Sequence, residues 1–259
     1  MKRFILILFL LLAAREIRAF GLAGHAAIAC IAEHHLTPRA RANIMRYTDH
    51  RSIVYYASWM DYMGYVTKSG YSNEWFDHCV PVNKDFEYAE GDFPGDALMA
   101  IEKAIERLGD GKYRNLDDST VLLLIKHLVL FLPDMHCPAH IRYPGNTTIG
   151  YYKVDYFGRE MRYHTIWDSE IVQRPHPWSF TDLAWLLDRY TETEQAEITS
   201  GTVYDWGRES AAASKCNYDV QPGESVATDF IKKYKPLAES QIAKAGYRLA
   251  AVLNDVFGK

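Results

Sequence analysis

The sequence lacks the features of several protein classes. Its four cysteines form no Cys-x-x-Cys pair, and the chain has no internal repeat, low-complexity tract or linker-like segment. It also lacks excess positive charge, since its formal net charge at pH 7 is −4. A protein that holds nucleic acid on a basic surface normally carries the opposite charge. With 259 residues, 48% hydrophobic, the sequence fits one globular domain with a large core better than two small ones.

The N-terminal residues are typical of a secretory signal. Lys2 and Arg3 precede an uncharged apolar run, residues 4–14, which is too short to span a bilayer comfortably. We expect residues 1–19 to be removed after Ala19, which leaves Phe20 as the first residue of a mature domain, 20–259. No second long apolar run follows the signal. We therefore expect a secreted or periplasmic protein without stable membrane insertion.

The charge of the mature chain restricts how it can bind phosphate. Residues 1–19 carry four basic side chains and one acidic side chain, so the mature chain has a formal charge of −7. If it acts on phosphates, bound metal cations must supply the positive charge locally.

Helical periodicity dominates the chain and predicts a mainly α, single-domain helical bundle. Residues 117–132 are apolar nearly all round, which indicates a buried central helix. Pro236 is expected to kink or split the last helix, over 227–257. Residues 149–164, rich in tyrosine and valine around Gly158, predict one small β-hairpin. The other expected helices cover 25–36, 38–47, 52–63, 96–108 and 179–190.

Histidines and aspartates recur in short clusters, one of which ends the apolar run "LVLFL". His164 and Asp168 are four residues apart, so on a helix both side chains face the same way. Imidazole and carboxylate ligands together suit zinc. From the spacing alone, a metal site and ordinary hydrogen bonds on a helix surface are equally good explanations. The candidate metal ligands are His25, Asp61, His78, Asp134, His140, His164 and Asp168.

The remaining histidines and the cysteines give weaker signals. His34 and His35 are expected to face solvent at a helix end, and His50 and His176 are expected in loops. Four cysteines allow three disulfide pairings, and the sequence favours none of them.

Several motifs occur in the order of a known family. They are "FGLAGH", "ASWMD", "FDHCVPV", "PDMHCPAH", "PGN", "HTIWD" and "QIAKAGYRLA". Together they resemble the S1/P1 family of zinc-dependent single-strand nucleases and 3′-nucleotidases. That family shares its helical fold with the bacterial zinc-dependent phospholipase C. The resemblance covers the whole mature chain.

The resemblance implies a centre of up to three zinc ions. Phe20 would bind through its amine and carbonyl, which requires cleavage before this residue. Asp134 would bridge two ions, and Asp61 would also orient the attacking water, so both are the expected catalytic residues. By resemblance the ligands are Phe20, His25 and Asp134 for the first ion, Asp61, His78 and Asp134 for the second, and His140, His164 and Asp168 for the third.

The chain departs from the family pattern in the shell of the second ion. Leu130 occupies the position of a histidine ligand and cannot coordinate a metal. His127 lies seven residues before Asp134, a helical rise of about 10.5 Å, and cannot reach the vacated position. His136 is nearer in sequence and remains an alternative. The second ion is therefore expected to be weakly bound, replaced or absent.

Two further departures concern the substrate. Gly64 replaces the arginine or lysine that the family places near the phosphate. Cys79 replaces an aromatic residue that stacks on the nucleobase. Tyrosines that could compensate, although their helical spacing is more typical of packing, are Tyr55, Tyr56, Tyr62 and Tyr65.

Three functions remain open. The first is a secreted, monomeric zinc phosphodiesterase that cleaves single-stranded nucleic acid or 3′-nucleotides with a metal-activated water. The second is a phospholipase C-like hydrolase of another phosphodiester, favoured by Gly64 and Cys79. The third is a non-catalytic metal-binding descendant, favoured by Leu130 and Gly64.

Overall fold

A computed structural model describes residues 20–59, 76–89, 95–142, 152–175 and 177–259 of the chain. Its α-helices are α1 (Gly21–His34), α2 (Pro38–Tyr47), α4 (Ala97–Leu108), α5 (Asp118–His136), α6 (Tyr163–Thr165), α7 (Ile171–Gln173), α8 (Phe180–Leu187), α9 (Glu192–Ile198), α10 (Val203–Ser214) and α11 (Thr228–Phe257). Shorter helical turns are η1 (Ile53–Tyr56), η3 (Lys112–Asn115), η4 (Pro138–His140), η6 (Ile166–Glu170) and η7 (Lys215–Asp219). The strands are β1 (Val80–Pro81), β2 (Ile141–Arg142), β3 (Lys153–Tyr156), β4 (Arg159–Arg162) and β5 (Ser225–Val226).

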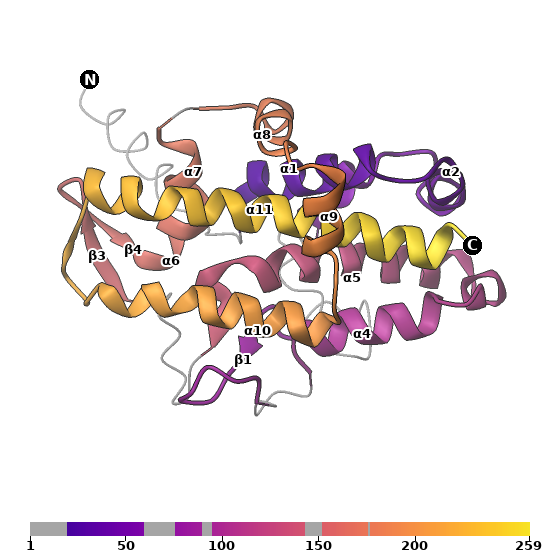
Figure 1. Ribbon diagram of the computed structural model, residues 1–259, viewed down its shortest axis with the longest axis horizontal. Helices are drawn as coiled ribbons and strands as arrows, with labels where there is room; N and C mark the ends of the chain where they lie inside the picture. Colours follow the sequence, from indigo (N-terminus) through magenta and orange to yellow (C-terminus); the bar gives the residue numbers. More distant parts are fainter. Residues whose placement is uncertain (1–19, 60–75, 90–94, 143–151, 176) are drawn as a thin grey trace, which may run out of the picture.

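The mainly α fold is confirmed, and α5 is its central helix. It packs against α4 on one side and α11 on another, and α11 also packs along α1 (Figure 1). Every residue of α5 from 127 to 136 is buried. By length and composition α5 could cross a membrane, but most of it lies inside the protein, as in the core helix of a globular domain. Its apolar surface therefore serves packing between helices.

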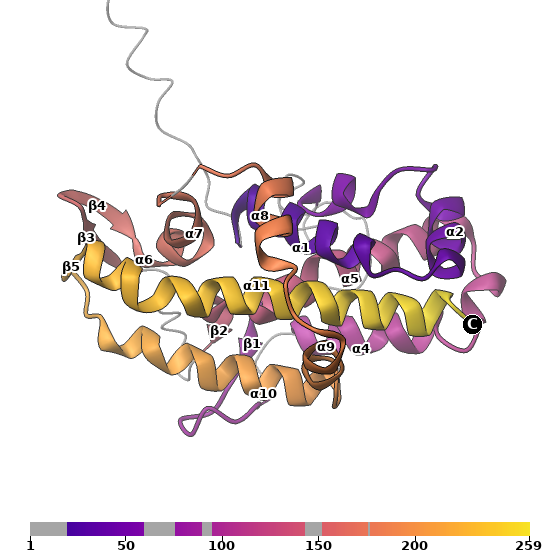
Figure 2. The same ribbon diagram turned by 45° about the horizontal axis from the view of Figure 1, so that its top comes forward.

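Helix α11 runs without a break through Pro236, so the expected split of the last helix is wrong. Close packing holds this helix on α1, because a Cβ atom added to Gly246 would lie 2.6 Å from a side-chain atom of Ile31. In Figure 2, α11 extends from the strand end of the molecule to the C-terminus. The long helix thus connects both ends of the bundle.

Helices α9 and α10 were not predicted from the sequence. Both begin with a capping box, in which Thr191 pairs with Glu194 and Thr202 pairs with Asp205. A threonine followed three residues later by an acidic residue is the sequence signal that marks such starts. Within the described residues, the expected helix over 52–63 contains the short turn η1 and the helical residue Trp59, and residues 60–63 lie outside the described part of the chain.

The predicted hairpin is confirmed as β3 and β4, joined by Phe157 and Gly158. Both turn residues have positive φ angles, 51° and 78°, as a two-residue type I′ turn requires. β5 adds a parallel strand on the other side of β3. The hairpin leads directly into α6, which carries His164.

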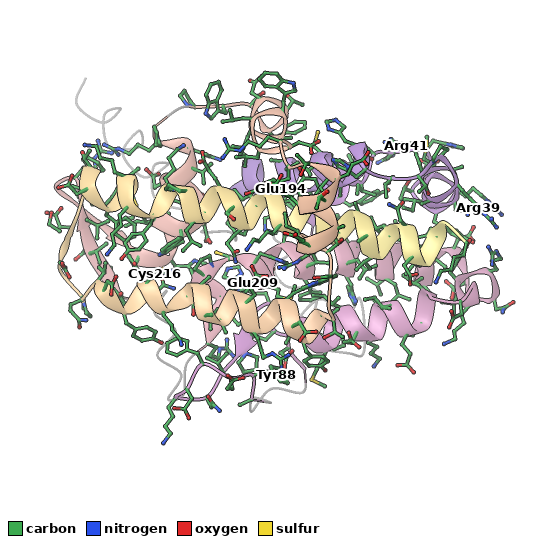
Figure 3. All side chains as sticks on the ribbon, viewed as in Figure 1. Arg39, Arg41, Tyr88, Glu194, Glu209 and Cys216 are labelled. Carbon is green, nitrogen blue, oxygen red and sulfur yellow. The ribbon has the colours of Figure 1, made fainter. Side chains whose placement is uncertain are left out.

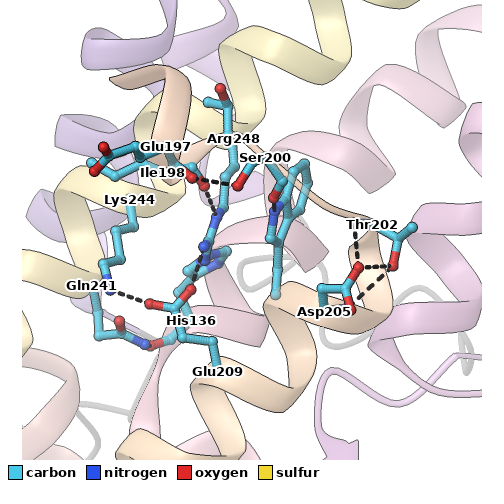
Figure 4. Close-up of polar contacts among 12 residues, drawn as sticks. His136, Glu197, Ile198, Ser200, Thr202, Asp205, Glu209, Gln241, Lys244 and Arg248 are labelled. Carbon is cyan, nitrogen blue, oxygen red and sulfur yellow. Dashed lines mark hydrogen bonds and ion pairs between the residues drawn. The ribbon is translucent and has the colours of Figure 1, made fainter. Parts of the chain in front are cut away.

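A buried polar network joins α5, α10 and α11 (Figure 4). The Nδ1 atom of His136 donates a hydrogen bond to the Leu132 carbonyl, 2.7 Å away, so its Nε2 atom accepts one from Arg248, 2.8 Å away. Arg248 also pairs with Glu209, which Figure 3 places on α10 facing α11. Gln241 donates to the His136 carbonyl over 3.0 Å. The network fixes the C-terminal end of α5.

The same network keeps His136 neutral. Burial, and then the charge of Arg248, lower its pKa from 6.5 to about 3. A neutral imidazole can accept the Arg248 hydrogen bond, whereas an imidazolium could not.

Replacing Arg248 with alanine should lower the free energy of unfolding by about 3 kcal/mol, because buried polar partners are left unpaired. Chemical denaturation measures the change. The matched control is Arg208→Ala on α10, which should have a much smaller effect, because solvent screens its exposed pair with Asp205. Equal effects of the two variants would contradict a special role for the buried network.

Candidate metal centre

The last turn of α5 and the residues after it form one side of the candidate centre. Asp134 is fully buried, and its carbonyl accepts a hydrogen bond from the Cys137 amide at 3.0 Å. The Cys137 carbonyl in turn accepts one from the His140 amide at 2.9 Å. These two bonds and the fixed φ of Pro138 hold Asp134, Cys137 and His140 in one compact turn.

Two imidazoles from different elements lie close to the Asp134 carboxylate. His25 Nε2, on α1, lies 3.2 Å from Asp134 Oδ1. His140 Nδ1 lies 3.5 Å from the same oxygen. All three side chains have no solvent-exposed surface. A carboxylate between two imidazoles is the arrangement expected of a shared metal ligand.

His164 and Asp168 extend the cluster. His164 Nδ1 lies 2.9 Å from Asp168 Oδ2, so the predicted pairing of these residues is present. Asp168 sits in the π-helical turn η6 and its Oδ1 atom lies 3.9 Å from His140 Nε2. The rings of His140 and His164 stack with centroids 5.0 Å apart. A π-helical turn inside a helix is often found at functional sites.

A short parallel strand pair brings His78 to the same place. Val80 pairs with Ile141 in register, so the residues before β1 and β2 lie side by side. The ring centroids of His78 and His140 are 4.6 Å apart. Asp77 Oδ1 lies 3.2 Å from His78 Nδ1, and Asp77 Oδ2 pairs with Arg142, so the carboxylate is held in place and orients the His78 ring.

The donor atoms fit a bound cation. Both oxygens of Asp134 and both ring nitrogens of His140 are buried without a hydrogen-bond partner among the described residues. Two groups of three residues have ligand atoms that all lie within 4.8 Å of one another. The first group is His78, His140 and His164, and the second is Cys137, His140 and Asp168. Buried carboxylates of this kind need a compensating cation or proton.

The protonation states suit metal binding at most of the centre. Burial, with the nearby charges of His78 and His164, holds the pKa of His140 well below 6.5, so its nitrogens are free to coordinate. Burial lowers the pKa of His78, but Cys79 and Asp77 outweigh it and hold the pKa well above 6.5. Burial and Asp168 raise the pKa of Cys137 well above 9.0. Metal binding would therefore release protons from His78 and Cys137.

Phe20 lies at the start of α1, next to the centre. It is buried, with φ 37°, and its carbonyl accepts a hydrogen bond from the Gly24 amide at 3.1 Å. A Cβ atom added to Gly21 would lie 3.2 Å from the Asp168 carbonyl. Gly21, the residue after the expected first mature residue, thus lies close to the turn that carries Asp168.

The structure gives no account of some predicted site residues. Asp61, Gly64, Tyr62, Tyr65 and the "PGN" turn lie outside the described residues.

Neither of the two other histidines on α5 replaces the missing ligand at Leu130. Leu130 is fully buried on α5, one turn or about 6 Å of rise before Asp134. His136, the alternative ligand, is wrong, because both of its nitrogens are engaged by Leu132 and Arg248. The His127 ring lies against Phe131, with centroids 5.5 Å apart.

Sequence reasoning missed two residues of the centre. Asp77 and Cys137 contact predicted ligands, although their positions beside His78 and His136 were visible in the sequence. His34 is exposed at the end of α1, as expected, with its Nδ1 atom 3.4 Å from the Asp188 carboxylate. His35 is half-buried, with its Nε2 atom 2.7 Å from the same carboxylate. All four cysteines are free thiols.

Comparison with known proteins identifies the family. The S1/P1 nuclease family model matches residues 20–258, and the chain therefore belongs to this family. It is 26% identical over 152 residues to Endonuclease 2 of Arabidopsis thaliana, covering 53% of this chain and 51% of that protein. It is 22% identical over 182 residues to Endonuclease 4 of the same plant, covering 61% of this chain and 57% of that protein. The matches thus span little more than half of these relatives.

Replacing Asp134 with asparagine should reduce the metal bound per chain, since a neutral amide is a weaker ligand for a cation than a carboxylate. Any phosphodiesterase activity should fall more than about 100-fold, because altering even the partners of ligands costs about 10- to 100-fold. Metal analysis and turnover measure both effects. The control is Asp229→Asn, exposed on α11. Unchanged metal content in Asp134→Asn would contradict the assignment.

Proposed function

We propose that this protein is an exported zinc-dependent phosphodiesterase that hydrolyses single-stranded nucleic acid or 3′-nucleotides. The observation that carries the proposal is the convergence of two buried carboxylates with four imidazoles at the end of α5. Membership of the S1/P1 nuclease family and the names of the Arabidopsis endonucleases support the nucleic-acid substrate. The signal-like residues 1–19 support export to the periplasm or medium.

The described residues divide into two ligand groups. His25 and Asp134 would hold one ion together with the backbone of Phe20. His140, His164 and Asp168 would hold another. When bound, such cations lower the pKa of a water towards neutrality and offset the charge of a phosphate. The protein contributes a dry, rigid ligand set, in which Asp77 orients His78.

The second ion has the least complete set of ligands in the proposed centre. Its remaining ligands would be Asp61, His78 and Asp134, with Leu130 in place of an imidazole. His136 does not restore it, because both of its nitrogens are engaged by Leu132 and Arg248. The same observation supports the competing proposal of a non-catalytic metal-binding protein, and Cys79 in place of a stacking aromatic supports a phospholipid or other phosphodiester as substrate.

The mature protein purified after export should cleave single-stranded DNA or RNA, or release phosphate from 3′-nucleotides. Removal of metal by a chelator should abolish activity, and zinc should restore it, because the ligands are imidazoles and carboxylates that suit this ion. Phosphatidylcholine vesicles serve as the parallel substrate. Cleavage of the vesicles alone would favour the phospholipase alternative, and no turnover on any phosphodiester with metal bound would favour the non-catalytic one.

Leu130→His should add about one zinc ion per chain and raise activity, since it restores an imidazole one helical turn before Asp134. Metal analysis and steady-state kinetics test this. The matched control is Leu132→His, which places an imidazole on a different face of α5. An unchanged zinc content in Leu130→His would show that the second site is not limited by this residue.

A further inference from the structure

Cys137 lies inside the candidate metal centre. Its side chain is fully buried, and its Sγ atom is 3.5 Å from Asp168 Oδ1. The ligand atoms of Cys137, His140 and Asp168 all lie within 4.8 Å of one another. Both ring nitrogens of His140 are buried without a hydrogen-bond partner among the described residues. The thiol of Cys137 therefore lies close to the ring nitrogens of His140, which have no hydrogen-bond partner among the described residues.

Two separations among Cys137, His140 and Asp168 are close to those of ligands around one ion. Zinc–sulfur bonds of about 2.3 Å and zinc–oxygen bonds of about 2.1 Å place sulfur and oxygen about 3.6 Å apart in a tetrahedron. The observed separation of Cys137 Sγ and Asp168 Oδ1 is 3.5 Å. Nitrogen and oxygen ligands would lie about 3.4 Å apart, and His140 Nε2 lies 3.9 Å from Asp168 Oδ1. Small side-chain shifts would complete the geometry.

We propose that Cys137 is a thiolate ligand of the ion held by His140, His164 and Asp168. Coordination breaks the S–H bond and releases the proton to solvent, so no oxidant or reductant is required. The inference rests on the metal centre of the proposed function but not on its substrate.

The proposal changes the chemistry expected of that ion. Four protein ligands are the number typical of structural zinc sites, whereas catalytic sites keep one position open. The thiolate also adds a negative charge and favours zinc or cobalt over magnesium, calcium or manganese. In this chain the third ion would therefore hold η4 against η6, and hydrolysis would depend on ions bound at Asp134.

Cobalt(II) loading of the metal-free protein tests the proposal. A thiolate ligand gives an intense sulfur-to-cobalt charge-transfer absorption in the near ultraviolet, which imidazole and carboxylate ligands do not. We expect this absorption in the unaltered protein, and its loss in Cys137→Ser while cobalt still binds. Cobalt affinity should fall at least about 10-fold in that variant, and loading should release one proton fewer.

Two control variants separate Cys137 from the other thiols. Cys79 lies beside Asp77 and His78 in another group of candidate ligands, and Cys216 contacts the Ala213 carbonyl at 3.1 Å. Both Cys79→Ser and Cys216→Ser should keep the absorption. X-ray absorption of the zinc-loaded unaltered protein should show one sulfur at about 2.3 Å, which keeps the test valid if Cys137→Ser fails to fold.

Each other outcome overturns the proposal. Cobalt binding without charge-transfer absorption would remove Cys137 from the ligand set and leave the proposed function intact. Loss of the absorption in Cys79→Ser alone would assign the thiolate to Cys79. Failure of the unaltered protein to bind cobalt or zinc at all would overturn the metal centre and the proposed function together.

Discussion

The burial of the Asp134 carboxylate is the constraint on which the rest of the structure depends. A carboxylate with no exposed surface is strongly disfavoured unless positive charge surrounds it. Two imidazoles lie within 3.5 Å of its Oδ1 atom, one from α1 and one from η4. The elements that cover α5 are thus arranged to deliver histidines to its end, and a bound cation would complete the compensation.

The opposite face of the same helix end is fixed by different chemistry. His136 lies two residues after Asp134 but points into the network of Arg248, Glu209 and Gln241. Neighbouring histidines therefore have unlike roles, because one helix end meets two environments. The Arg248 network anchors α5 to α11, while the carboxylate on the other face stays available to the centre.

Leu130 and Cys137 lie at different sides of the candidate metal centre. Leu130 removes an imidazole from the ligand set, whereas Cys137 places a sulfur beside Asp168 at the other side of the cluster. In the proposed centre, Leu130 would weaken one ion and a Cys137 ligand would strengthen a neighbouring one. A centre altered in this way would favour metal retention over turnover, which gives the non-catalytic alternative a physical basis.

The sequence alone determined the mainly α class, the hairpin before His164, and the set of imidazole and carboxylate candidates, because these depend on local periodicity and residue type. It also predicted the pairing of His164 with Asp168, since four residues make one helical turn. Only the tertiary structure decided which distant histidines join Asp134 and His140, because His25 and His78 approach from segments far apart in the chain. The β1–β2 pairing, the Arg248 partner of His136 and the contact of Cys137 with Asp168 arise from packing between such segments, which no local pattern encodes.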